Sequence, residues 1–240
     1  MRKVAIGFAA ITVLAYGAAN AVTIDTFQSG SVDFTVYGPV GNVGDVLNTG
    51  LPSTETIGGT RYVEANIIQA DDGTDDKVEV RRLSGSGAGL FDVANTVGSD
   101  SVVTVVWDRN GAGLGGIDLT TNANGLYISF PSKINNALKL TFTITNTTEQ
   151  TRTGIFNFPD KFAGLNDFLS FTDFGGTGTF TSTSAITMEM NSSAGWDARL
   201  DLIDTRNEVP IPGTLLLMGI GLGALLRRIR PDWGWMGRLA

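Results

Sequence analysis

Between residues 138 and 145, four apolar residues alternate with four polar ones in the order Leu-Lys-Leu-Thr-Phe-Thr-Ile-Thr. Successive side chains of a β-strand point to opposite faces, so this alternation predicts a strand with one buried and one solvated face. Such a strand belongs in an antiparallel sheet that faces water on one side. Shorter stretches of the same pattern at residues 32–37 and 77–81 predict two more half-buried strands.

Further strand patterns recur along the chain and are separated by turn dipeptides. They lie at residues 61–70, 102–107, 126–130, 153–158, 168–174, 185–190 and 198–203. Residues 102–107 are almost continuously apolar and β-branched, which predicts a central strand. The turn signals are Asp72-Gly73, Asn110-Gly111, Asn124-Gly125 and Gly175-Gly176.

No window between the two ends of the chain keeps a helical period for three turns. Many short strands, abundant threonine and glycine, and no alternation of strands with helices predict an all-β fold, an antiparallel β-sandwich of jelly-roll-like type. A one-sided β-solenoid is the competing architecture, but the sequence lacks the fixed repeat that a solenoid needs.

The chain has 240 residues and contains neither cysteine nor histidine. Their absence excludes a Ser-His-Asp triad, a nucleophilic cysteine and the common zinc sites. A glycosidase needs only two carboxylates and therefore stays open as an enzymatic alternative. Residues 111–116 are rich in glycine, but they follow a strand pattern and open no helix, so they do not form a nucleotide-binding loop.

The N-terminal end has the three parts of a secretory signal peptide. Arg2 and Lys3 precede an apolar stretch at residues 4–15, and Ala19-Asn20-Ala21 supplies the small-x-small pattern that signal peptidase accepts. We therefore predict a signal-peptide helix over residues 1–21, with Ala19 and Ala21 at the cleavage site. The mature chain would begin at Val22.

The C-terminal end combines a proline box, an apolar segment and an arginine cluster. The relevant residues are Val209, Pro210 and Pro212 in the box, Leu215, Gly219, Gly223 and Leu226 in the apolar segment, and Arg227, Arg228 and Arg230 in the cluster. The prolines end the folded body, and the arginines stay on the cytoplasmic side of a membrane. We predict a single membrane helix here, and the Gly219/Gly223 spacing allows another helix to approach it closely.

This order of parts over residues 209–230 resembles the PEP-CTERM sorting signal of exported Gram-negative proteins. In that family an exosortase, a membrane-embedded cysteine transpeptidase, recognises the tail and removes it near the proline box. The resemblance implies an exosortase substrate, anchored transiently in the inner membrane with its body in the periplasm and then delivered to the cell surface. An ordinary C-terminal membrane anchor is the alternative, and residues 231–240 form an extension beyond the arginines.

The body, residues 22–208, is long enough for one domain with its own core. It contains 11 basic and 23 acidic residues and carries a net charge of −12. Nucleic acid needs a basic surface, so it is not expected as a partner. Several stretches of the body are similar to segments of uncharacterised proteins of the same family, and they lie at residues 58–61, 107–108, 185–190 and 197–203.

Three clusters in the body are candidates for ligand binding. Asp71, Asp72, Asp75 and Asp76 surround a predicted turn, where carboxylates would suit Ca²⁺, although no calcium-loop signature is present and a solvated hairpin tip is the alternative. Trp107-Asp108-Arg109-Asn110 and Trp196-Asp197 each place an aromatic ring beside polar groups, a combination that binds sugars. Because Trp107 ends an apolar strand, a position in the core is the preferred interpretation, and Trp196 is interpreted in the same way.

The sequence thus predicts a non-catalytic exported protein of the envelope or extracellular matrix, without a cofactor. Signal peptidase and an exosortase would be its processing partners. The family resemblance implies an association with exopolysaccharide. A carbohydrate-binding surface adhesin is the alternative function.

Overall fold

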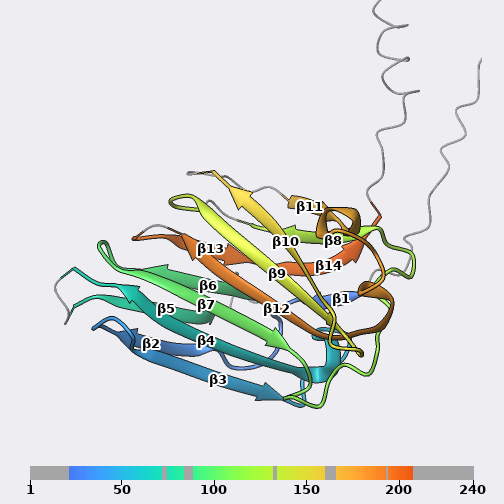
Figure 1. Ribbon diagram of the computed structural model, residues 1–240. Helices are drawn as coiled ribbons and strands as arrows, with labels where there is room; N and C mark the ends of the chain where they lie inside the picture. The colour runs from blue at the N-terminus through green and yellow to red at the C-terminus, as the bar shows by residue number, and fades with distance from the viewer. Residues whose placement is uncertain are drawn as a thin grey trace, which may run out of the picture. The chain divides into compact units, whose positions relative to one another are not determined.

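The computed structural model describes residues 22–71, 75–83, 89–131, 134–159, 166–192 and 194–207. In this part of the chain the fold is all-β, and each strand pairs with its neighbours in the antiparallel sense. The strands form two packed layers (Figure 1). No helix among these residues has the length and apolar character needed to cross a membrane. The predicted signal peptide, sorting tail and C-terminal extension lie outside the described residues.

The first layer is a six-stranded sheet with the order β10-β9-β12-β7-β4-β3. Its strands are β3 (Val43–Thr49), β4 (Thr60–Gln69), β7 (Asp100–Trp107), β9 (Leu138–Asn146), β10 (Thr151–Phe158) and β12 (Thr183–Ser192). Strand β7 lies between β4 and β12, as the apolar pattern of residues 102–107 predicts.

The second layer consists of two four-stranded sheets with the orders β13-β6-β5-β2 and β1-β14-β8-β11. The strands are β1 (Thr23–Asp25), β2 (Asp33–Tyr37), β5 (Lys77–Leu83), β6 (Leu90–Asn95), β8 (Gly125–Ser129), β11 (Asn166–Ser170), β13 (Asp197–Leu200) and β14 (Leu202–Arg206). Only Asp201 separates β13 from β14, and the chain changes its partner there from β6 to β8.

The core lies between the inner faces of the two layers. Along β9 the predicted apolar residues are all buried. Along β5 Val78 and Val80 are buried, while the charged residues that alternate with them are partly exposed. Burial of this apolar surface provides the main stabilisation of a sandwich. Many consecutive strands cross from one layer to the other, as they do in a jelly roll.

The predicted strand at residues 168–174 is wrong in its second half. Strand β11 ends at Ser170, and a 3₁₀ helix, η3 (Phe171–Phe174), follows. The Ser170 hydroxyl accepts a hydrogen bond from the Thr172 amide, and the Asp173 carboxylate accepts one from the Ser170 amide. In this capping box, side-chain oxygens accept the hydrogen bonds of the amides at the start of the helix. The chain can therefore leave the strand at Ser170.

Gly125 is the first residue of β8, although Asn124-Gly125 was predicted as a turn. It pairs with Ser170 on one side and with Arg206 on the other. A Cβ at this position would lie 2.5 Å from the carbonyl oxygen of Leu169 and 2.3 Å from the Phe168 ring. The glycine is therefore needed for a close approach of two strands rather than for a turn.

Candidate functional site: the outer face of the six-stranded sheet

The outer face of the six-stranded sheet carries a cluster of threonines. Strands β10, β9 and β12 are neighbours in this sheet, and their inward residues are buried. Six of their outward residues form what we call the threonine face: Thr141, Thr143, Thr145, Thr151, Thr153 and Thr187. All six are partly or fully exposed to solvent.

Cross-strand pairing places three of these threonines in one row. Thr143 lies opposite Thr187 on one side and opposite Thr153 on the other. The Oγ1 atoms of Thr143 and Thr153 are 3.4 Å apart. The row continues through Val106 and Tyr62, so it crosses five strands and spans roughly 20 Å at the usual strand spacing.

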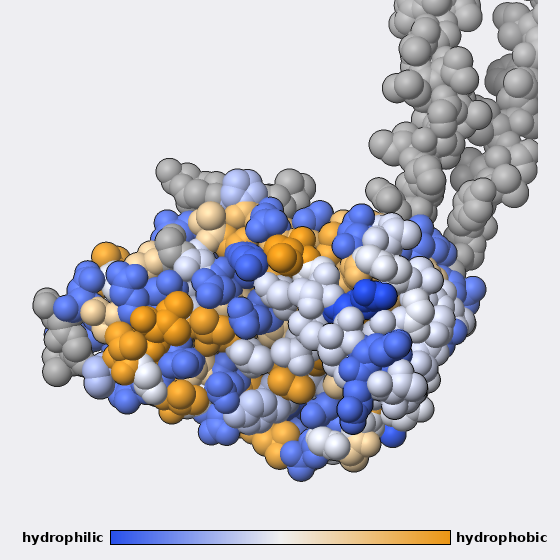
Figure 2. Space-filling model, viewed as in Figure 1, coloured by the Kyte–Doolittle hydropathy of each residue, from blue (hydrophilic) through white to orange (hydrophobic). Residues whose placement is uncertain are grey.

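Hydroxyl groups give this face its chemical character. A threonine hydroxyl both donates and accepts hydrogen bonds and rotates to suit its partner. Figure 2 shows the same side of the molecule, where pale side chains of intermediate hydropathy lie among hydrophilic and hydrophobic ones. Glu189 and Lys139 lie in neighbouring rows, opposite Thr141 and Asn157 respectively. The arrangement suits a ligand that is itself rich in hydroxyl groups.

Tyr62 adds an aromatic ring to the same row. Its hydroxyl donates a hydrogen bond of 2.8 Å to the Glu64 carboxylate. This hydrogen bond, together with the negative charge of Glu64, raises the pKa of Tyr62 well above its ordinary value. The hydrogen bond to Glu64 fixes one edge of the ring beside the threonine face.

Trp107 is fully buried, as expected for a tryptophan at the end of an apolar strand, so its ring cannot stack on a sugar. Its indole Nε1 donates a 2.8 Å hydrogen bond to the Asp25 carboxylate. Asp25 also accepts two 2.9 Å hydrogen bonds from the Arg61 guanidinium, and both residues have no exposed side-chain surface. We call Asp25, Arg61 and Trp107 the buried ion-pair cluster.

The buried ion-pair cluster joins β1 to the six-stranded sheet. Asp25 is the last residue of β1, Arg61 lies in β4, and Trp107 is the last residue of β7. Burial raises the pKa of the Asp25 carboxyl, and the positive charge of Arg61 opposes that rise. The guanidinium also lies 5.3 Å from the centre of the Phe27 ring, in cation–π contact. This cluster is structural.

Trp196 is also fully buried, which excludes the second predicted sugar site. Its indole Nε1 donates a hydrogen bond of 3.3 Å to the Ser101 carbonyl oxygen. The adjacent Asp197 accepts hydrogen bonds from the Asn95 amide and from the Asn135 side chain, each at 3.2 Å. Both residues therefore hold loops and strands together rather than a ligand.

The predicted acidic cluster is only partly described. Asp71 and Asp75 are exposed, whereas Asp76 is buried and accepts a 2.6 Å hydrogen bond from the Asp71 amide. Asp72 lies outside the described residues. Within the ranges that the structure covers, no three acidic side chains gather in a way that would hold a metal ion.

The fold and the threonine face define an all-β sandwich protein with an open, hydroxyl-rich sheet face. The sequence matches no protein-family model and no curated protein. Among solved structures, the family 11 carbohydrate-binding module of the cellulosomal cellulase Lic26A-Cel5E of Clostridium thermocellum is 13% identical, with a TM-score of 0.39 over 80% of this chain and 99% of that one. TmCBM61 in complex with β-1,4-galactotriose is 11% identical, with a TM-score of 0.34 over 59% and 88%.

The enzymatically active domain of tailspike protein 4 from bacteriophage CBA120 is also 11% identical, with a TM-score of 0.32 over 78% of this chain and 21% of that one. At this level of similarity, the ligands and activities of these proteins do not transfer to this chain.

Proposed function

We propose that the protein is an exported, non-catalytic surface protein that binds polysaccharide through its threonine face. The observation that carries this proposal is the row of Thr187, Thr143 and Thr153, which are paired across three strands on an open sheet face. A polysaccharide chain presents hydroxyl groups along its length, and each can exchange a hydrogen bond with water for one with a threonine.

The dimensions and charge of the face agree with a long, neutral ligand. The row extends over five strands, which favours an extended chain over a small molecule. The six threonines carry no charge, although the body as a whole has a net charge of −12. A neutral polysaccharide has no net charge, so the negative charge of the body does not repel it.

Replacing the three central threonines by valine should abolish much of the binding. Valine keeps the shape and the strand preference of threonine but has no hydroxyl. Three lost hydrogen bonds at about 0.5–1.5 kcal/mol each should weaken binding at least tenfold in a Thr143→Val, Thr153→Val, Thr187→Val protein. Affinity electrophoresis of residues 22–208 in gels that contain neutral polysaccharides, including the exopolysaccharide of the producing cells, measures the effect.

A Thr35→Val protein is the control, because Thr35 is an exposed threonine on β2 in the second layer. It should migrate like the unchanged protein in every gel. Equal retardation of the triple variant and the unchanged protein, at equal thermal stability, would exclude the threonine face. Absence of retardation for the unchanged protein across the panel would exclude polysaccharide binding itself.

We further propose that the sorting tail delivers this sandwich to the envelope. The proposal is supported by the proline box, the apolar segment and the arginine cluster of residues 209–230. The intact mass of the protein from its own cells should begin at Val22 and should lack everything beyond the proline box only when the exosortase is present. Retention of residues 215–226 with and without the enzyme would instead indicate a simple membrane anchor.

A further inference from the structure

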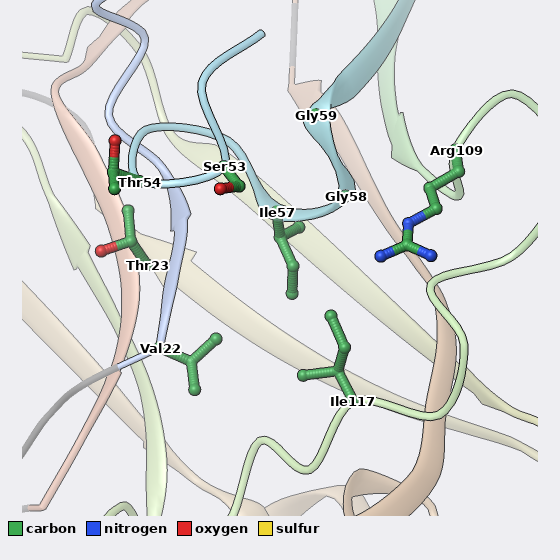
Figure 3. A pocket seen from close by; sticks show the side chains of 9 residues that line it. All are labelled: Val22, Thr23, Ser53, Thr54, Ile57, Gly58, Gly59, Arg109 and Ile117. Atoms are coloured by element: carbon green, nitrogen blue, oxygen red, sulfur yellow. The ribbon is translucent and has the colours of Figure 1, made fainter. Parts of the chain in front are cut away.

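A pocket of about 540 Å³ opens where β1, the loop before β4 and the loop after β7 meet (Figure 3). Its volume lies within the range of small-molecule sites. Val22, Ile57 and Ile117 provide apolar wall, and Figure 3 shows their side chains converging on the space between them. The hydroxyl-bearing residues Thr23, Ser53 and Thr54 line it as well. The pocket is separate from the threonine face.

Arg109 is the only cationic residue among the described residues that line this pocket. Figure 3 shows its guanidinium directed toward Ile57 and Ile117. Among the residues that the structure covers, this guanidinium has no ion-pair partner and no hydrogen bond. Arg109 is itself exposed, whereas buried Arg61 and partly buried Arg81 and Arg206 each pair with a carboxylate.

The backbone around Arg109 holds its side chain at the pocket. Arg109 itself has a φ of 54°, in the left-handed region that a non-glycine residue adopts at a cost. Its side chain passes over Gly58, where a Cβ would lie 2.9 Å from the Arg109 Cγ. Gly58 also has a φ of 69°, so both its conformation and its missing side chain make room for the arginine. The free cation is thus positioned by its surroundings.

From this arrangement we propose that the pocket binds a uronic acid, with its carboxylate on the Arg109 guanidinium. The planar guanidinium fork matches a carboxylate in bidentate geometry. The apolar wall formed by Val22, Ile57 and Ile117 would contact the C–H groups of the sugar ring.

Glucuronate and glucose provide a direct test, because they have the same sugar ring. Glucuronate carries a carboxylate where glucose carries a hydroxymethyl group. We expect glucuronate to perturb the amide NMR signals of Gly58, Gly59 and Arg109 in the mature protein, and glucose to have no such effect at the same concentration. An Arg109→Gln protein should lose at least tenfold in affinity for glucuronate. Arg109→Lys should recover part of it, since lysine keeps the charge but not the fork.

Arg152→Gln is the matched control, because Arg152 is an exposed arginine outside the pocket and its replacement removes the same charge. It should bind glucuronate like the unchanged protein. Equal binding of glucose, equal binding of inorganic sulfate at the same sites, or unchanged affinity in Arg109→Gln would overturn the proposal. The triple valine variant of the threonine face should bind glucuronate normally, so the two proposals can fail independently.

Discussion

Replacing Arg61 by methionine should destabilise the protein more than any other single change considered above. Asp25 would remain buried without its cation, and an uncompensated buried charge typically costs about 3–5 kcal/mol. For a domain of this size that cost corresponds to a fall in melting temperature of roughly 10 °C. Thermal unfolding of residues 22–208, followed by circular dichroism, measures the difference.

Two further variants identify the cause. Lys77→Met removes the same charge from a partly exposed pair with Glu79 and should change the melting temperature little. Asp25→Asn combined with Arg61→Met removes both charges, so we expect it to be more stable than Arg61→Met alone. The single variant Asp25→Asn completes the comparison. If the double variant loses as much stability as Asp25→Asn and Arg61→Met lose together, the ion pair is not responsible for the loss.

Gly125→Ala should be the second most damaging change, although it adds only one methyl group. The new Cβ would lie 2.5 Å from the Leu169 carbonyl oxygen, and a backbone atom of a paired strand cannot move aside without disturbing the β8–β11 pairing. Overpacking of this kind costs about 1–3 kcal/mol. Because Gly125 does not lie in the left-handed region, the clash rather than backbone strain would be the cause. Denaturant unfolding gives the free-energy change.

Gly178→Ala is the appropriate comparison, since no atom lies within 4 Å of a Cβ at that position. Its backbone also lies outside the left-handed region, so the alanine should be neutral or slightly stabilising. Equal stability of the Gly125→Ala and Gly178→Ala proteins would mean that β8 and β11 do not approach each other as closely as described.

The strands with clear alternation could be predicted from the sequence, whereas those without it could not. The period of two in residues 138–145 is set by burial on one face, and β9 follows it residue by residue. Strands β1, β3 and β6 were not predicted. Strand β1 has only three residues, and β3 contains a glycine and three polar residues that interrupt the pattern. Strand β6 has three consecutive buried residues, Phe91 to Val93, which hide any alternation.

The sequence contained the residues of the candidate sites but not their arrangement. Whether Trp107 is exposed depends on Asp25, which is 82 residues away and accepts its indole hydrogen bond. Arg109, two residues further on, lies instead at the pocket beside Gly58. Neighbours in the sequence thus take opposite roles because the chain turns between them. The threonines were visible as the polar half of an alternating strand, but only the register of β9 with β10 and β12 assembles them into a row.

The pairing of β1 with β14 has a mechanical consequence. The Thr205 amide donates to the Val22 carbonyl oxygen, and β14 is flanked by β1 on one side and by β8 on the other. A tether attached after Asn207 would therefore transmit load into an interior strand rather than into a peripheral one. In the proposed role at the cell surface, two ladders of hydrogen bonds would resist a shear force at once.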